Sequence, residues 1–176
     1  ELRERGLAGM KFKVGGLTPA EDAERFRIAR AAAGPDFVLM ADANQGWTPA
    51  EAIRFSRLVE DLDLHWFEEP CVWSNDRRAM RDVRFAGGVR VCAGQSEMSA
   101  GGCRDLMVEG AIDYCNFDSS WSGGATEWRR VAAAAEVGDG SVELGLGDAE
   151  LHPGRLQRSR AREMGEPVVG QAGDHG

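Results

Sequence analysis

The sequence contains no hydrophobic run long enough to cross a lipid bilayer, and no secretory leader is expected. A membrane-spanning helix needs roughly 18 or more consecutive apolar residues, so no membrane anchor is predicted. An excess of basic residues is also absent: 21 Lys and Arg stand against 29 Asp and Glu, which gives a formal net charge of -8. Nucleic acids and anionic membranes attract basic surfaces, so neither is expected as the main partner.

Paired cysteine motifs and nucleotide-binding motifs are missing as well. The four cysteines, Cys71, Cys92, Cys103 and Cys115, show no CxxC spacing, so the sequence predicts neither a zinc site nor a redox pair. Cys92 and Cys115 lie in apolar, strand-like runs, which is typical of reduced core residues and favours a cytoplasmic location. No GxGxxG or Walker A sequence supports a dinucleotide or nucleotide triphosphate fold.

What the sequence does contain is a regular alternation of strand-like and helix-like segments. Short apolar runs alternate with amphipathic segments, and two of these begin with the capping sequence Thr-Pro-Ala-Glu. This alternation predicts an α/β fold with a parallel sheet, and it favours a partial (β/α) TIM-type barrel, covering about strands 2 to 7, over a doubly wound sheet. The expected strands are 10–15, 37–42, 64–70, 89–94, 111–118 and 141–145, and the expected helices are 17–34, 48–59, 76–87, 99–110 and 124–138.

The alternating pattern stops after Gly145. Residues 146–176 contain scattered Gly, Pro and Arg without a strand or helix pattern, so we expect a partial barrel over 1–145 and an irregular tail over 146–176. A truncated or frame-shifted gene product would explain the change. Because an open barrel leaves strand edges unpaired, we expect such a chain to aggregate or to form a homo-oligomer.

Ionisable side chains recur where the predicted strands end. The carboxyl ends of the strands form the active-site face of a TIM-type barrel, so these groups are expected to share one rim. Several carboxylates in a partly dry pocket repel one another, and a hard divalent cation such as Mg2+ is the simplest remedy. A lysine on the neighbouring strand could then act as a base. In chain order the residues are Lys11, Lys13, Asp42, Glu68, Glu69, Glu97 and Asp118.

Five stretches, taken in order, resemble the enolase superfamily, and within it the mandelate racemase and muconate lactonizing enzyme branch. The resemblance implies a fragment of the C-terminal barrel domain of such an enzyme. It implies that Asp42, Glu68 and Glu97 bind Mg2+. It also implies that Lys13 removes the proton α to a substrate carboxylate, with Lys11 as its electrostatic neighbour. The stretches are KFK at 11–13, DANQGW at 42–47, WFEEP at 66–70, AGQSE at 93–97 and NFDSSWSGG at 116–124.

The same resemblance implies further site residues and a substrate class. Asp118 is expected to orient a catalytic His at the end of the next strand, and Asn44 and Gln45 to lie near the substrate or the metal. That His is missing from its expected place at Leu146 and Gly147. The last stretch looks most like the acid-sugar dehydratases, hydro-lyases that remove the α-proton and expel the β-hydroxyl group as water. The implied partner is a small acid sugar. The capping domain and the first barrel strand of that family are not found in this sequence.

Other interpretations stay open from the sequence alone. The chain could be a catalytically inactive remnant of such an enzyme, which the missing His favours, or a racemase or cycloisomerase of the same branch. A metal-dependent hydrolase on a TIM barrel is a weaker alternative, because the three histidines do not lie at strand ends. Two single residues also have plainer interpretations: Glu69 as a structural ion-pair partner, and Asp118 as the cap of a turn.

Overall fold

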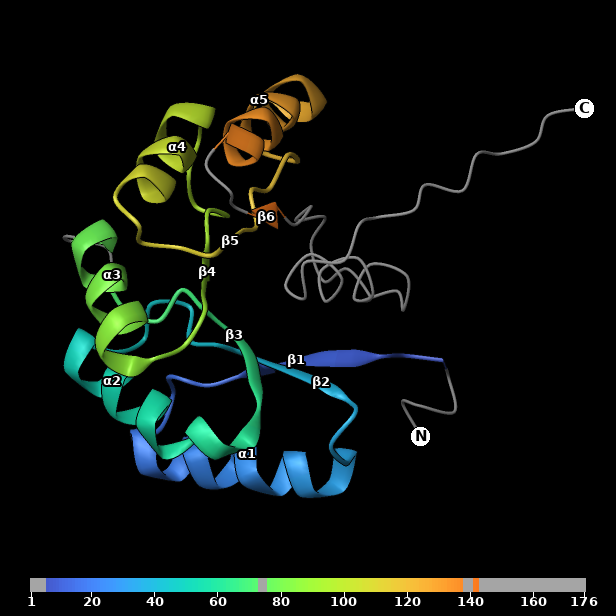
Figure 1. Cartoon of the computed structure of the whole chain (residues 1–176), viewed down its shortest axis with the longest axis vertical. Coiled ribbons are helices and arrows are strands. Elements are labelled where there is room, and N and C mark those ends of the chain that lie inside the picture. Colours follow the sequence, from blue (N-terminus) through green and yellow to red (C-terminus); the bar gives the residue numbers. More distant parts are fainter. Residues whose placement is uncertain (1–5, 73–75, 138–140, 143–176) are drawn as a thin grey trace, which may run out of the picture. The chain divides into compact units, whose positions relative to one another are not determined.

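The computed structural model describes residues 6–72, 76–137 and 141–142 of the chain. The chain divides into two compact units, one formed by residues 9–149 and the other by residues 1–8 and 150–176. The described helices and strands all belong to the first unit (Figure 1). The expected irregular tail, 146–176, lies outside the described residues.

In the described part of the chain, six parallel strands form one sheet. Their order in the sheet is their order in the sequence, β1-β2-β3-β4-β5-β6. Sequential parallel strands joined by helices are the repeating unit of a (β/α) barrel, so the predicted partial barrel is confirmed. The strands are β1 (Gly9–Lys13), β2 (Val38–Asp42), β3 (Leu64–Glu68), β4 (Val91–Ala93), β5 (Tyr114–Cys115) and β6 (Ser141–Val142).

The connecting helices lie on one face of the sheet (Figure 1). Both Thr-Pro-Ala-Glu sequences form complete capping boxes, in which Thr18 and Thr48 accept hydrogen bonds from the backbone of Glu21 and Glu51. Within the described ranges, none of the helices has the length and apolar character needed to span a bilayer. The helices are α1 (Pro19–Ala33), α2 (Pro49–Leu58), α3 (Asp76–Gly87), α4 (Ala100–Val108) and α5 (Gly124–Val137), with a short 3-10 helix, η1 (Glu60–Leu62), that the sequence did not predict.

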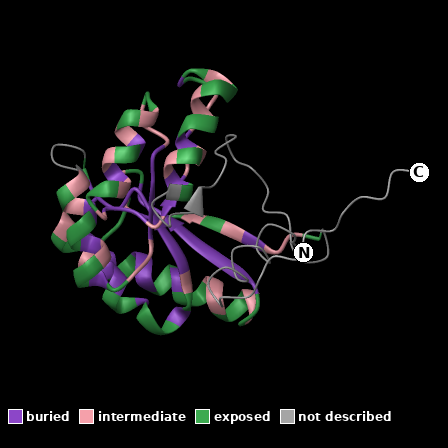
Figure 2. Cartoon of the chain, turned by 45° about the horizontal axis from the view of Figure 1, so that its top comes forward, coloured by how far each residue is buried: buried purple, intermediate pink, exposed green. Residues whose placement is uncertain are grey.

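Aromatic side chains pack helices α1 and α2 against the sheet. Phe26, Phe55 and Phe67 are fully buried, and the ring of Phe55 lies 6.3 Å from that of Phe26 and 5.2 Å from that of Phe67. Figure 2 shows helices whose outer faces are exposed and strands that are mostly buried, with β1 more exposed than its neighbours. Neighbouring residues of a strand point to opposite faces, so packing Phe67 against the helices directs Glu68 to the other face of the sheet. The packing of Phe67 in the core thereby sets the direction in which Glu68 points.

All four cysteines are free and buried. Cys92 and Cys115 belong to β4 and β5, where both are almost completely inaccessible to solvent. The prediction that these two residues are part of the core is therefore confirmed.

Gly15 allows the loop after β1 to lie against the loop after β2. Its φ is +90°, and a Cβ at this position would lie 2.7 Å from the carbonyl oxygen of Ala43. We expect Gly15→Ala to lower the free energy of unfolding by about 1–3 kcal/mol, because it combines backbone strain with steric overlap. Urea unfolding measures the change. Gly16→Ala is the matched control, since a Cβ there meets no atom within 4 Å, and an equal loss in both variants would contradict the prediction.

Candidate active site

Two buried carboxylates lie next to each other at the carboxyl ends of β2 and β3. Asp42 and Glu68 are the last residues of these strands and are paired in register. They are 0% and 1% exposed. The Nζ atom of Lys11 lies 2.8 Å from Oε1 of Glu68 and 3.2 Å from Oδ2 of Asp42. Because two carboxylates this deeply buried repel each other, the shared ammonium group is what makes the arrangement stable.

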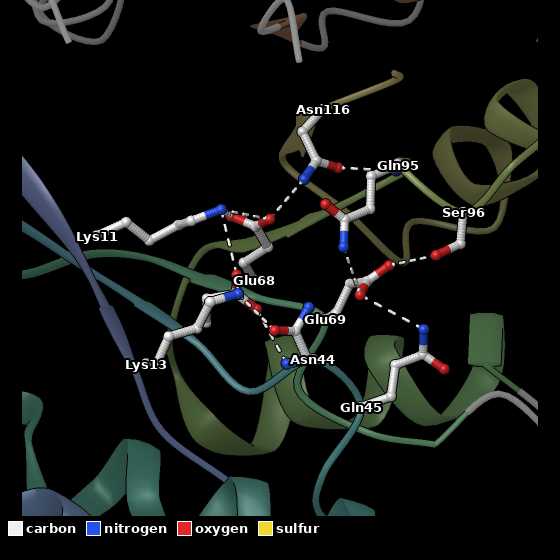
Figure 3. Close-up of polar contacts among 10 residues, drawn as sticks. Lys11, Lys13, Asn44, Gln45, Glu68, Glu69, Gln95, Ser96 and Asn116 are labelled. Atoms are coloured by element: carbon white, nitrogen blue, oxygen red, sulfur yellow. Dashed lines mark hydrogen bonds and ion pairs between the residues drawn. The ribbon is translucent and has the colours of Figure 1, made fainter. Parts of the chain in front are cut away.

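The lysines of β1 supply the positive charge for this pair (Figure 3). Lys11 donates hydrogen bonds to both carboxylate oxygens of Glu68, at 2.8 and 2.9 Å. Lys13 donates to Oδ2 of Asp42 at 2.6 Å and also to Oδ1 of Asn44. Alternate residues of a strand share a face, so both lysines point to the side of the sheet that carries the carboxylates. The predicted meeting of lysines, Asp42 and Glu68 at one rim is found in the structure.

Lys11 and Lys13 are the only lysines in the sequence, and the other 19 of its 21 basic residues are arginine. A guanidinium group stays protonated at any physiological pH, whereas an amine can release a proton. The chain therefore has amines only where they contact the buried carboxylates. This scarcity of lysine is a signal that the sequence analysis did not use.

Burial and neighbouring charges shift the pKa values of Glu68 and Lys11. Burial raises the pKa of the Glu68 carboxyl and repulsion from Asp42 raises it further, while attraction to Lys11 acts in the opposite direction. Burial alone would lower the pKa of Lys11, but Glu68 and Asp42 outweigh it and leave that pKa above its ordinary value. Lys11 therefore stays protonated, and its charge helps to keep Glu68 ionised.

Amide groups complete the hydrogen bonding of the two carboxylates. Asn116, which follows β5, donates from Nδ2 to Oε1 of Glu68 at 2.8 Å. The backbone N–H of Asn44 donates to Oδ1 of Asp42 at 2.9 Å. Asn44 was predicted to lie near the substrate or the metal, and it lies beside Asp42 and Lys13. Asn116 was missed, although its position just beyond a strand end marks it in the same way as the carboxylates.

Glu69 forms a second polar cluster beside the first (Figure 3). Its carboxylate is buried and accepts hydrogen bonds from Oγ of Ser96 at 2.8 Å, Nε2 of Gln95 at 2.9 Å and Nε2 of Gln45 at 3.4 Å. These three donors are neutral, and Glu69 forms no ion pair with any residue that the structure describes. Gln45, predicted as a substrate-binding residue, is therefore directed to Glu69. Gln95 and Ser96 were missed because the sequence analysis followed ionisable groups.

The structure does not bring Glu97 to Asp42 and Glu68. Glu97 lies beyond the end of β4, its carboxylate lies against Gly102 of α4, and its Oε1 is 3.9 Å from Nη2 of Arg77. Among the described residues, no group of three or more His, Cys, Asp or Glu side chains is arranged to hold a metal ion. Of the three predicted metal ligands, the structure places Asp42 and Glu68 side by side, while Glu97 follows β4 in the loop that leads to α4, and its part in a metal site stays a prediction.

Asp118 caps a turn. Its Oδ1 accepts hydrogen bonds from the backbone N–H of Ser120 at 2.8 Å and from the Ser120 hydroxyl at 2.6 Å. Leu146 and Gly147, where its histidine partner was expected, lie outside the described residues. The contacts of Asp118 in the structure are therefore those of a turn cap, the plainer of its two interpretations.

The sequence profile described as Enolase C-terminal domain-like matches residues 1–153. The chain belongs to this enolase family. A crystal structure of a mandelate racemase/muconate lactonizing enzyme from a marine actinobacterium, in complex with magnesium, is 62% identical in sequence and has a TM-score of 0.78. That similarity covers 80% of this chain and 39% of the other. The predicted membership of the enolase superfamily and of its mandelate racemase and muconate lactonizing enzyme branch is confirmed.

Two curated relatives are a cycloisomerase and a dehydratase. The 3,6-anhydro-alpha-L-galactonate cycloisomerase of Streptomyces coelicolor is 35% identical over 132 residues, which are 75% of this chain and 36% of the relative. The L-talarate/galactarate dehydratase of Salmonella typhimurium is 33% identical over 129 residues, which are 73% of this chain and 32% of the relative. The chain therefore spans about a third of the length of these members of the enolase family.

Replacing Lys11 tests how far the buried carboxylates depend on its charge. We expect Lys11→Met to lower the free energy of unfolding at pH 7 by about 1–3 kcal/mol, a range reduced from that of a fully buried pair because solvent reaches part of Lys11. Without Lys11 the pKa of Glu68, already raised, rises further. When folding raises the pKa of a carboxyl group, the folded chain loses stability as the pH rises from the ordinary pKa of that group through its raised pKa. The loss should therefore be smaller at pH 5 than at pH 7 in urea unfolding.

Arg27→Met is the control, because it removes a cation from an ion pair with Glu24 in which both side chains are exposed. This change should cost less than about 1 kcal/mol at either pH. A loss in Lys11→Met that is equal at the two pH values would show that Glu68 does not need Lys11 to stay ionised.

Proposed function

We propose that this chain carries the metal-binding and proton-abstracting part of an enzyme that acts on an acid sugar. The proposed reaction is of the dehydratase type: the proton α to a carboxylate is removed and water is eliminated. The contact of Lys13 with Asp42, which is buried and paired with Glu68, is the observation that carries the proposal. Removal of an α-proton needs a base and a means of stabilising the negative charge that develops on the carboxylate, and this rim offers groups for both. The names of the relatives support sugar acids as the substrate class.

The donor chemistry of the pair fits Mg2+. Asp42 and Glu68 offer carboxylate oxygens, the ligands that Mg2+ prefers. In the structure their two negative charges are balanced by two ammonium groups, and a divalent cation carries the same total charge. When bound, Mg2+ would stabilise the negative charge on the substrate carboxylate as the α-proton leaves. The magnesium complex of the 62% identical relative supports this choice of metal.

The third protein oxygen is proposed to come from the loop after β4. The family resemblance assigns Glu97, whose carboxylate faces Gly102 and not the pair. Gln95 is the alternative, because its backbone N–H donates to Oδ1 of Asn116, whose amide group donates to Glu68. Both residues are therefore included in the test of the site.

The remaining residues of the rim are proposed to serve the substrate. Lys13 is the proposed base, and Lys11 is the cation that remains close to it on the same face of β1. Asn44, which contacts the base, and Gln45, whose side chain contacts Glu69, are proposed to contact the substrate from the loop after β2. The proposal assigns Asp118 no part in proton transfer, since its hydrogen bonds are those of a turn cap.

Calorimetric titration with Mg2+ tests the metal site. We expect the unaltered chain to bind Mg2+ and Asp42→Asn to weaken binding at least about tenfold, because a neutral amide replaces a charged ligand. Asp36→Asn, at an exposed residue just before β2, controls for the change in net charge. Equal affinities for the two variants would exclude Asp42 as a ligand.

The same titration identifies the third oxygen. If Glu97 is the ligand, Glu97→Gln should weaken binding at least about tenfold and by more than Gln95→Ala does. If Gln95 is the ligand, the effects should be reversed, and Gln95→Glu should tighten binding because it adds a negative charge. If neither variant changes the Mg2+ affinity, both residues are excluded as the third ligand.

Hydrogen exchange at the α-carbon tests Lys13 separately from elimination. In deuterated water with Mg2+ and galactarate, the chain should introduce deuterium α to the carboxylate, which proton NMR follows. We expect Lys13→Ala to slow this exchange at least about 100-fold. Lys13→Arg is the sharper variant, because arginine keeps the positive charge near Asp42 but does not release a proton.

Exchange that persists in Lys13→Arg would exclude Lys13 as the base. If the unaltered chain binds Mg2+ but exchanges no proton with any sugar acid, the interpretation as an inactive remnant gains support.

A further inference from the structure

We propose that Glu69 is a positioning residue that fixes the orientation of Glu68 through a chain of hydrogen bonds. Glu69 and Glu68 are adjacent in the sequence: Glu68 is the last residue of β3, and Glu69 follows it with a positive φ. The nearby charge of Glu69 repels the Glu68 carboxylate, and the hydrogen bonds that link the two side chains in the described structure run through other residues. Glu69 acts through the loop after β4 and the residue that follows β5. The consequence for Mg2+ binding rests on the proposed function, whereas the hydrogen-bond chain itself does not.

The first link joins Glu69 to the loop after β4. The buried carboxylate of Glu69 accepts hydrogen bonds from Nε2 of Gln95 and from Oγ of Ser96, at 2.9 and 2.8 Å. Hydrogen bonds to an ionised acceptor are stronger than those between neutral groups. A buried charge also requires these donors, because without them it would be left without compensation. Glu69 therefore holds Gln95 and Ser96 firmly in place.

The next links run from Gln95 to Glu68 (Figure 3). The backbone N–H of Gln95 donates to Oδ1 of Asn116 at 3.1 Å, and Nδ2 of Asn116 donates to Oε1 of Glu68 at 2.8 Å. An amide group accepts with its oxygen and donates with its nitrogen, so a bond on one side fixes the direction of the other. The placement of Gln95 therefore decides which way Asn116 presents its donor to Glu68.

Glu69 also holds the loop after β2. Its carbonyl oxygen accepts a hydrogen bond from the backbone N–H of Gln45 at 2.8 Å, and its carboxylate accepts one from the Gln45 side chain. Asn44, the preceding residue, contacts Lys13. Three of the four described non-glycine residues with positive φ are Asn44, Gln45 and Glu69. Strained conformations of this kind persist only where the surrounding contacts hold them, and they gather at functional sites.

The charge of Glu69 strengthens these bonds. Glu69→Gln keeps the size of the side chain but presents one oxygen and one NH2 group to the donors of Gln95, Gln45 and Ser96. Because the Ser96 hydroxyl can also accept, the NH2 group can donate to it while the remaining oxygen keeps the bonds from Gln95 and Gln45. Those bonds then lose their charged acceptor and become weaker. We expect the side chain of Gln95 to be held less firmly, the amide group of Asn116 to be less fixed in direction, and Glu68 to be less firmly oriented toward Lys11.

The test compares side-chain amide signals and Mg2+ affinity in Glu69→Gln. In proton–nitrogen NMR spectra of the metal-free chain, we expect the amide signals of both Gln95 and Asn116 to shift. The dissociation constant for Mg2+ should rise about tenfold, a typical effect of losing a residue that orients a ligand. The matched control is Glu127→Gln. Glu127 accepts a hydrogen bond from the backbone N–H of Ala100 at the start of α4, outside the cluster around Glu69. The control should lower stability but leave both amide signals and the Mg2+ affinity unchanged.

A shift of the Gln95 signal without a shift of the Asn116 signal would overturn the proposal. Equal Mg2+ affinities in Glu69→Gln and Glu127→Gln would overturn it as well. If the unaltered chain binds no Mg2+, the proposed function fails, and the amide signals alone then decide on Glu69. Should Glu69→Gln not fold, Gln95→Ala cuts the same chain of bonds without removing the buried charge. The Asn116 signal must then shift for the proposal to stand.

Discussion

Two carboxylates buried side by side require positive charge, and the arrangement of the rim follows from that requirement. Asp42 and Glu68 come into register because β2 and β3 pair as parallel strands. Leaving both charges uncompensated would cost more free energy than a domain of this size can spare. The pairing of β1 with β2 places Lys13 beside Asp42 and Lys11 on the same face. The proposed metal site and the observed lysine contacts are two ways of meeting the same electrostatic requirement.

The order of helices and strands could be predicted because each signal is local. The capping sequences that begin with Thr18 and Thr48 specify where α1 and α2 start, and the apolar runs specify the strands between the helices. Asp42 and Glu68 could be predicted for the same reason: each is the last residue of its strand, so the backbone of the strand decides where the side chain lies.

The roles of Gln95, Ser96 and Asn116 and the placement of Glu97 could not be predicted, because these residues follow the strands instead of ending them. A loop can turn in any direction after a strand, so spacing along the sequence did not place Glu97. Gln95 and Asn116 carry no charge, and a search for ionisable groups passes over them. Their role depends on which donor meets which acceptor, and that is settled only when loops distant in the sequence come together.

The loop after β4 explains why Glu97 and Gln95 diverge. Gly94 has a φ of +132°, and a Cβ there would lie 2.8 Å from the sulfur of Cys115, so the backbone turns close against β5. This turn directs Gln95 to Glu69 and carries Glu97 on to the start of α4, near Arg77. A carboxylate at a helix N-terminus near an arginine is electrostatically favoured. Glu97 would have to give up that environment to join Asp42 and Glu68, whereas Gln95 already contacts Asn116. We therefore infer that bringing Gln95 to Asp42 and Glu68 costs less free energy than bringing Glu97 there.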